Sequence, residues 1–204
     1  MVIRVGVLEL QGDYALHHQI FEVMEIESVP VKKSSDLNNI DGLVIPGGES
    51  TTISLLIDNF NMYDCLVEFG IENPIMGTCA GLIMMANTVD DKRINPLRLV
   101  NIDVERNAYG RQIQSGTEFI QFDFNDKHKV VLPTTMIRAP RIKEINSDIK
   151  VIGKYGHSPI AILSGHHLCL SFHPELDQVD IFHRVLFDPQ SEIYYKKIDQ
   201  YHVA

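Results

Sequence analysis

The chain has 204 residues, of which 45% are hydrophobic and 22% are charged, and its formal net charge is −9. This composition is typical of a folded globular protein and excludes a disordered chain. The negative balance, without any dense run of Lys and Arg, argues against nucleic acid or an anionic membrane surface as the main partner. The length suits a single domain, residues 1–204, with a sizeable core.

The cysteines and the first residues indicate where the protein works. Three cysteines at unrelated spacings, Cys65, Cys79 and Cys169, form neither a disulfide framework nor a set of metal ligands. We therefore expect a reducing compartment, the cytoplasm. Residues 1–13 contain only a short apolar run followed by acidic residues. They predict neither a signal peptide nor a membrane span.

The first half of the chain alternates short apolar runs with helical patterns. Strands are expected at residues 2–8, 29–32, 41–48 and 74–77, and helices at residues 13–25, 51–58, 62–70 and directly after Cys79. The apolar face of the first helix is expected to hold Leu16, Ile20, Val23 and Met24. Such alternation of strands and helices predicts a parallel sheet with helices on both faces.

The second half is richer in strands. Strand-like runs follow one another from residue 97 to 137, and three more are expected at residues 150–154, 158–163 and 167–172. Helices are expected near residues 178–187 and 191–201. We interpret the chain as one α/β domain in which antiparallel strands are added to a parallel core.

Gly77-Thr78-Cys79-Ala80-Gly81 lies between a predicted buried strand and a helix. This is the pattern of a nucleophile elbow, in which a strained turn exposes the nucleophile and flanking glycines avoid collisions. The helix N-terminus would favour the thiolate, and the N–H of Ala80 could donate to an oxyanion. A small buried cysteine at a tight turn would give the same local pattern.

A catalytic thiol needs a base and a group that orients the base. His173 follows an apolar strand in Ser-Phe-His-Pro-Glu, and in an extended segment it would project on the same side as Glu175. Glu175 could then fix the imidazole tautomer. No role is assigned to His166 and His167, and the other histidines are expected on helix faces or in loops, most of them solvated: His17, His18, His128, His157, His183 and His202.

Pro46-Gly47-Gly48-Glu49-Ser50-Thr51-Thr52 stands at the carboxyl end of another predicted strand, the edge where ligands bind in open α/β sheets. The N–H of Gly48 could be a second oxyanion donor, and Ser50 or Thr51 could cap the following helix. The segment lacks the Gly-Lys-Ser/Thr ending of a phosphate-binding loop. A simple turn into a capped helix would fit the same residues.

GTCAGL, PGGEST and SFHPE, in this order and spacing, resemble the motifs of class I (triad-type) glutamine amidotransferases. LELQGD (8–13), ERNAYGRQ (105–112) and IRAP (137–140) make the chain more similar to one family, the glutaminase subunits of heteromeric pyridoxal 5′-phosphate synthases. The likeness runs nearly end to end. It implies a three-layer α/β fold with a flavodoxin-like sheet, mostly parallel with added antiparallel strands.

The resemblance also implies an activity and a set of roles. L-Glutamine would be hydrolysed to glutamate and ammonia, and the ammonia would pass to a partner synthase subunit within a large hetero-oligomer, with no metal or bound cofactor. Cys79 would be the nucleophile, His173 the general base and then acid, and Glu175 the orienting carboxylate. The glutamine-binding residues would be Gly48, Glu49, Ser50, Arg106, Ile137 and Arg138. Gln11 matches a residue near the oxyanion hole and the partner interface.

Three alternatives remain open at the level of sequence. The chain could be the amidase subunit of another pathway, which would keep the triad and change the partner. It could be a cysteine protease or glyoxalase-like protein, although Ala80 rather than a histidine follows Cys79. It could also be a binding module on the same fold, which the intact triad disfavours.

Overall fold

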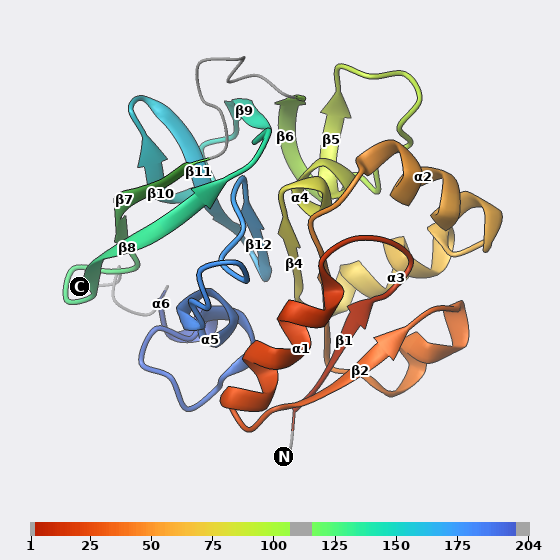
Figure 1. Cartoon of the computed structure of the whole chain (residues 1–204), viewed down its shortest axis with the longest axis horizontal. Helices are drawn as coiled ribbons and strands as arrows, with labels where there is room; N and C mark the ends of the chain where they lie inside the picture. Colours follow the sequence, from red (N-terminus) through yellow and green to blue (C-terminus); the bar gives the residue numbers. More distant parts are fainter. Residues whose placement is uncertain (1–2, 107–115, 199–204) are drawn as a thin grey trace.

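The computed structural model describes residues 3–106 and 116–198. Its main sheet has nine strands: β1 (Arg4–Leu8), β2 (Glu27–Val31), β3 (Gly42–Ile45), β4 (Ile75–Thr78), β7 (Gly116–Asp123), β8 (Lys129–Met136), β10 (Lys150–Tyr155), β11 (Ser158–Ser164) and β12 (His167–Leu170). Their order is β2-β1-β3-β4-β12-β11-β10-β7-β8 (Figure 1). The main sheet therefore contains both the first and the last strand of the described chain.

Half of the main sheet is parallel and half is antiparallel. The strands β2, β1, β3, β4 and β12 pair in parallel. From β12 to β8, each strand pairs antiparallel with its neighbour. The expected parallel core with added antiparallel strands is confirmed, and the central position of β4 places its carboxyl end in the middle of the molecule.

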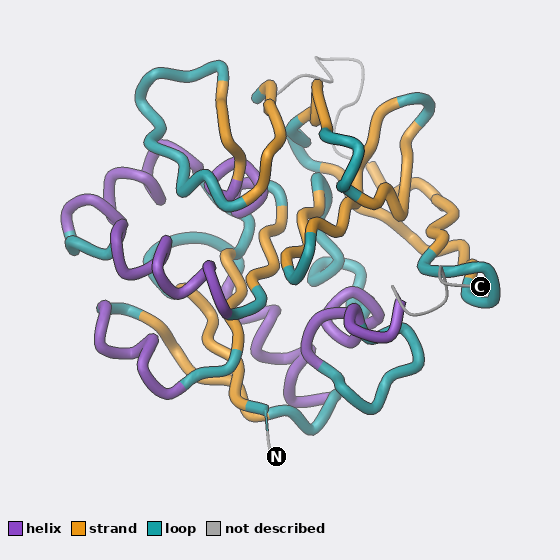
Figure 2. Tube along the Cα trace, turned by 180° about the vertical axis from the view of Figure 1, so that it is seen from behind, coloured by secondary structure: helices purple, strands orange, loops and turns teal. Residues whose placement is uncertain are grey.

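Helices cover both faces of this sheet, which gives three layers (Figure 2). One face packs against α1 (Tyr14–Val23), α5 (Ile181–Phe187) and α6 (Tyr195–Ile198). The other packs against α2 (Ser50–Asn59), α3 (Tyr63–Glu72), α4 (Ala80–Met85) and a 3-10 helix (Ser34–Asn39). Along β3, Leu43 and Ile45 contribute to the second core and Val44 to the first. Apolar residues on both faces are the reason that the strand reads as a continuous hydrophobic run.

A second, three-stranded sheet in the order β5-β6-β9 was only partly anticipated. It consists of β5 (Ala86–Val89), β6 (Val100–Glu105) and β9 (Arg141–Ile145). The strand expected near residue 100 lies here rather than in the main sheet. It pairs parallel with β5 and antiparallel with β9, neither of which was predicted.

Two local predictions were wrong. Val23 is 75% exposed, and the buried residues of α1 are His17, Ile20 and Phe21. The cap of α2 is Glu49, whose carboxylate accepts hydrogen bonds from the N–H groups of Thr51 and Thr52. Residues 107–112 of ERNAYGRQ, the end of the helix expected at 191–201, and His202 lie outside the described residues.

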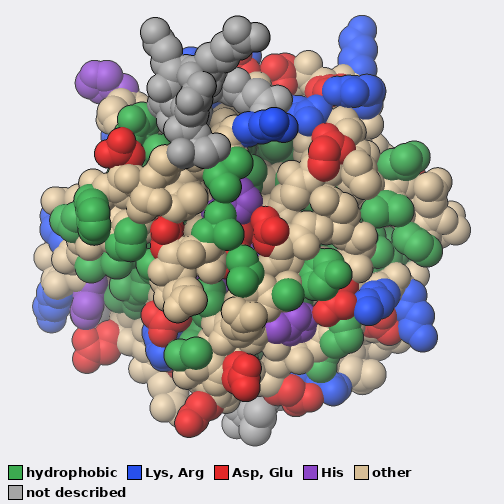
Figure 3. Space-filling view, viewed as in Figure 1, with side chains coloured by type: hydrophobic (Ala, Val, Ile, Leu, Met, Phe, Trp, Pro, Cys, Tyr) green, Lys and Arg blue, Asp and Glu red, His purple; other side chains and the backbone are tan. Residues whose placement is uncertain are grey.

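Acidic and basic side chains are interspersed over the face seen in Figure 3. In the described part of the chain, no helix is long and apolar enough to cross a membrane.

The junction of β4 and α4 depends on two close backbone contacts. A Cβ atom at Gly77 would lie 2.6 Å from the carbonyl carbon of Gly81, and one at Gly81 would overlap the carbonyl oxygen of Ile45 in β3. These obstacles are backbone atoms, which cannot rotate away. The two glycines therefore let the helix start directly against the sheet, as the elbow pattern predicts.

Gly81→Ala should consequently lower the free energy of unfolding by about 3 kcal/mol, because the added methyl group forces β3 and α4 apart. Gly165→Ala is the matched control: Gly165 has a φ of 57° but open space around it, so only backbone strain of about 1 kcal/mol is added. Urea denaturation of both variants measures the difference. Equal losses would contradict the tight junction.

Candidate active site

Cys79 lies at the elbow between β4 and α4, near the middle of the sheet. Its φ of 47° and ψ of −98° are sparsely populated for a residue with a side chain. The N–H of Cys79 donates to the carbonyl oxygen of Leu170 in β12, at 2.8 Å. The residue is 7% exposed, and its Sγ lies 3.8 Å from the carbonyl oxygen of Ile137. The backbone therefore holds the sulfur in a single, partly shielded place.

His173 and Glu175 follow β12, the strand beside β4. The Nδ1 atom of His173 lies 2.7 Å from Oε1 of Glu175, and both residues are buried, with 4% and 1% of their surface exposed. The segment is a turn rather than extended: the N–H of Leu176 donates to the carbonyl oxygen of His173. Pro174 suits the second position of such a turn because its φ is already fixed. The predicted pairing is present although the predicted backbone was wrong.

The turn is fixed against β8 by Thr135. The N–H of His173 donates to the carbonyl oxygen of Thr135 at 3.0 Å. The N–H and hydroxyl of Thr135 in turn donate to the carboxylate of Asp177, each at 2.7 Å. The antiparallel half of the sheet thereby positions the imidazole.

The protonation of His173 is shifted by its neighbours. Burial disfavours the charged ring, but interactions with the thiol of Cys79 and the carboxylate of Glu175 outweigh it and raise the pKa of His173 to about 10. The site therefore favours an imidazolium beside the sulfur, the state in which a cysteine is a nucleophile.

Two backbone N–H groups lie where an oxyanion could be bound. Ala80 is the first residue of α4, so no preceding helical turn accepts its N–H. Gly48 lines the same pocket. Gln11 supports this loop, because its Oε1 accepts the N–H of Glu49 at 2.8 Å. The N–H of Asp13 donates to the carbonyl oxygen of Gly47 at 3.0 Å.

A cavity of about 440 Å³ brings most of the predicted site residues together. Its lining consists of Asp13, Gly48, Glu49, Ser50, Cys79, Ala80, Ile83, Arg106, Ile137, Arg138 and His173. Gln11 and Glu175 do not line the cavity but contact residues that do: Gln11 accepts the N–H of Glu49, and Glu175 contacts His173. Asp13 and Ile83 were not predicted; Asp13 stands two residues after Gln11 in LELQGD, which was the available signal.

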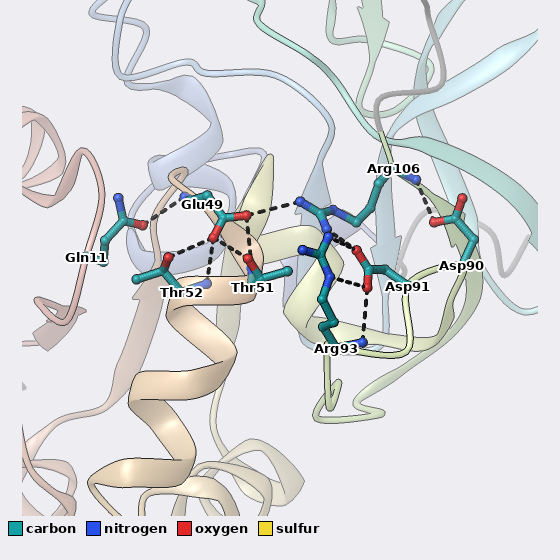
Figure 4. Close-up of polar contacts among 8 residues, drawn as sticks. All are labelled: Gln11, Glu49, Thr51, Thr52, Asp90, Asp91, Arg93 and Arg106. Atoms are coloured by element: carbon teal, nitrogen blue, oxygen red, sulfur yellow. Dashed lines mark hydrogen bonds and ion pairs between the residues drawn. The ribbon is translucent and has the colours of Figure 1, made fainter.

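A network of charges holds one side of the cavity, and Figure 4 shows it. Arg106 donates to Glu49 at 3.1 Å and also to Asp91. Asp91 also accepts a hydrogen bond from the guanidinium of Arg93, at 2.6 Å. The hydrogen bonds from the two arginines, chiefly those from Arg93, hold the pKa of Asp91 well below its usual range. Burial opposes ionisation of Glu49, but the hydrogen bonds from Thr51 and Thr52 lower its pKa to about 2. Both carboxylates are therefore charged, and Arg106 is already paired.

Arg138 differs from Arg106 in its surroundings. It is exposed, has a φ of 47° and lines the cavity. Within residues 3–106 and 116–198 it makes no ion pair. It is therefore an available cation for an anionic substrate group.

Asp13, His173 and Glu175 are the one group in the described chain whose ligand atoms could together face a metal ion, all lying within 4.8 Å of one another. One oxygen of Glu175 is already hydrogen-bonded to the Nδ1 atom that would be the ligand. The geometry is thus that of an oriented base rather than of a free set of ligands.

Two histidines that were expected to be solvated are in fact buried. His17 of α1 and His183 of α5 have no exposed surface, and they lie behind Glu175. A single polar residue on a helical face carries no signal of its partner when that partner lies 166 positions away. Sequence reasoning therefore missed this pair.

Comparison with known proteins agrees with this geometry. A model of the SNO glutamine amidotransferase family matches residues 7–188. The chain is 40% identical to "Pyridoxal 5′-phosphate synthase subunit PdxT" of Brevibacillus brevis, over 93% of this chain and 98% of that protein. It is 41% identical to the protein of the same name from Solibacter usitatus, over 85% and 92%.

Solved structures agree as well. A crystal structure described as a glutamine amidotransferase superposes with a TM-score of 0.83 at 32% identity, covering 89% of this chain and 96% of that one. A glutamine amidotransferase from Thermotoga maritima, at a TM-score of 0.58 and 14% identity over 100% of this chain and 87% of that one, shares the fold. By its matched length and its identity to these relatives, the chain belongs to the SNO glutamine amidotransferase family.

Proposed function

We propose that Cys79, His173 and Glu175 are the catalytic triad with which this chain hydrolyses L-glutamine to glutamate and ammonia. The chain is the glutaminase subunit of a pyridoxal 5′-phosphate synthase, in keeping with the names of its relatives. The observation that carries the assignment of the triad is the 2.7 Å contact between His173 and Glu175, directly beside a cysteine on a strained elbow.

The first half of the reaction forms a thioester. The thiolate of Cys79 attacks the side-chain amide carbon of glutamine, and the carbonyl oxygen becomes an oxyanion facing the N–H groups of Gly48 and Ala80. One such donor is worth about 3–4 kcal/mol of barrier in acyl transfer. The imidazolium of His173 then gives its proton to the leaving nitrogen, so that ammonia departs and a γ-glutamyl thioester remains.

The second half returns the enzyme to its starting state. His173, now neutral, accepts a proton from water while the water oxygen attacks the thioester carbon. The collapsing intermediate releases glutamate and the thiolate of Cys79. Glu175 keeps the Nδ1–H of His173 in place in both halves, so that Nε2 is the atom that gives and takes the proton.

The cavity offers complementary charges for the two ends of the amino acid. Arg138 is placed for the α-carboxylate, and Glu49 is placed for the α-ammonium group. Arg106 holds Glu49 and is itself held by Asp91, so its role is to shape the pocket. Ser50 and Ile137 complete the lining.

We also propose that residues 1–204 form one glutamine amidotransferase domain and act in the cytoplasm. The three cysteines are free, which suits a reducing compartment. The ammonia-accepting partner is the synthase subunit, in a large hetero-oligomer. Because release of free ammonia would be wasteful, we expect the isolated chain to be weakly active.

The pathway and the nucleophile can be tested together by measuring glutamate release from L-glutamine. We expect strong release only with a pyridoxal 5′-phosphate synthase subunit present, and none from Cys79→Ala because no thioester can form. Cys65→Ala, in α3, is the matched control and should keep full activity. Release that ignores this subunit would assign the glutaminase to another pathway, and release by Cys79→Ala would refute the triad.

Binding of the α-carboxylate can be tested with Arg138→Gln. Loss of a charge-assisted hydrogen bond, worth about 1.5–3 kcal/mol, should raise KM for glutamine by about 10- to 100-fold and leave kcat nearly unchanged. Lys154→Gln removes an exposed charge from β10 and should change neither constant. An unchanged KM in Arg138→Gln would show that the carboxylate binds elsewhere.

A further inference from the structure

Two buried histidines, His17 and His183, lie beyond Glu175 in the core. Nε2 of His17 lies 3.7 Å from Oε2 of Glu175 and 3.5 Å from the hydroxyl of Thr78. Nδ1 of His17 lies 2.9 Å from Nε2 of His183. The residues thus follow one another as Cys79, His173, Glu175, His17 and His183, from the cavity to the packing of α1 against α5.

Both inner rings are neutral. Burial is the largest influence on each and lowers the pKa of His17 and of His183 to about 3, although the carboxylate of Glu175 partly opposes this at His17. A neutral imidazole has one N–H donor and one bare nitrogen acceptor. The 2.9 Å contact between the rings therefore has one of only two arrangements of protons.

In the first arrangement, Nε2–H of His183 donates to Nδ1 of His17, and the N–H of His17 is on Nε2, facing Glu175. The atom left unpartnered is the bare Nδ1 of His183, which has no hydrogen bond in the structure. In the second, His17 donates to His183. That would leave a buried N–H without a partner on His183 and turn the lone pair of His17 toward the carboxylate.

The first arrangement is favoured on both counts. An orphaned buried N–H is rarer and costlier than an acceptor without a donor. A lone pair facing a carboxylate is repulsive, whereas an N–H dipole facing it is attractive. The packing of α5 thereby determines which nitrogen of His17 carries the proton.

Glu175 needs such support because it is 1% exposed and its Oε2 has no hydrogen bond. Its other oxygen, Oε1, faces Nδ1 of His173, and a buried polar atom such as Oε2 costs free energy unless a donor faces it. The 3.7 Å separation is longer than a hydrogen bond, and contacts of this kind often shorten when substrate binds. The other titratable groups around the pair are Asp13, His18, Glu22, Cys79, His173 and Asp180.

We propose that His17 is a positioning residue of the triad: its ring, oriented by His183, holds the Glu175 carboxylate toward His173, so that the carboxylate can stabilise the imidazolium. This rests on the proposed function, because it assigns His17 a part in the same glutamine hydrolysis. It predicts an effect on the pH dependence of the site, which a residue that only fills space would not have.

The test uses His17→Leu, which removes the N–H, and His17→Gln, whose side-chain amide can present an N–H in the place of Nε2. In the complex with the synthase subunit, His17→Leu should lower kcat about tenfold with little change in KM. The acid limb of its pH profile should move upward by about one pH unit. His17→Gln should restore the wild-type profile.

Met24→Ala is the matched control, since Met24 is buried at the C-terminal cap of α1 and carries no group that could donate a hydrogen bond to Glu175. It should lose stability without moving the acid limb. If His17→Leu does not fold, His183→Leu replaces it, because it removes the donor that orients His17. The proposal would be overturned if the acid limb did not move in His17→Leu, or in His183→Leu where that variant replaces it. It would also be overturned if the acid limb moved by the same amount in Met24→Ala.

A second readout separates this proposal from the proposed function. The rate at which iodoacetamide alkylates Cys79, measured by mass spectrometry of its peptide against pH, requires no glutamine. Its acid limb should move upward in His17→Leu and stay in place in His17→Gln. Such a shift without any glutamine hydrolysis would refute the proposed function and keep the positioning role. Glutamine hydrolysis together with an unshifted acid limb of alkylation would support the proposed function and refute the positioning role of His17.

Discussion

The left-handed backbone of Cys79 is the constraint on which the rest of the site depends. It lets α4 begin directly at the carboxyl end of β4, and it can exist only because Gly77 and Gly81 permit contact between backbones. The same turn directs the sulfur into the cavity and leaves the N–H of Ala80 at the start of the helix. A relaxed backbone at this residue would displace both the nucleophile and a donor to the oxyanion.

The second requirement is a buried carboxylate that is held toward His173. Glu175 is 1% exposed and lies between two histidines, His173 and His17. The parallel pairing of β4 with β12 brings Cys79 and His173 to adjacent strand ends. The added antiparallel strands then hold the base through Thr135 and Asp177. The mixed sheet therefore brings Cys79 together with His173 and Glu175, the residues of the proposed triad.

Sequence reasoning succeeded where the cause is local. The alternation of apolar runs, the glycines around Cys79 and the order of the motifs were enough to predict the parallel core and most residues of the cavity, but not Asp13 and Ile83. It failed where the cause is tertiary. The partners of β6 depend on long-range pairing. The buried face of α1 runs through His17, Ile20 and Phe21, which leaves Val23 exposed, and the partner of His17 lies on α5. One local cause was also missed: Glu49 caps α2, because its carboxylate accepts the N–H groups of Thr51 and Thr52.

The central claim is that the elbow and Glu175 together keep His173 protonated beside the sulfur of Cys79. A titration of the His173 ring by NMR, in the wild-type chain and in Cys79→Ala, tests it most directly. In the wild type, the account predicts that the His173 ring stays protonated far above its ordinary pKa of 6.5 and has a pKa of about 10. In Cys79→Ala, which lacks the sulfur, the ring should titrate at a lower pH. Titration near 6.5 in both proteins would contradict it.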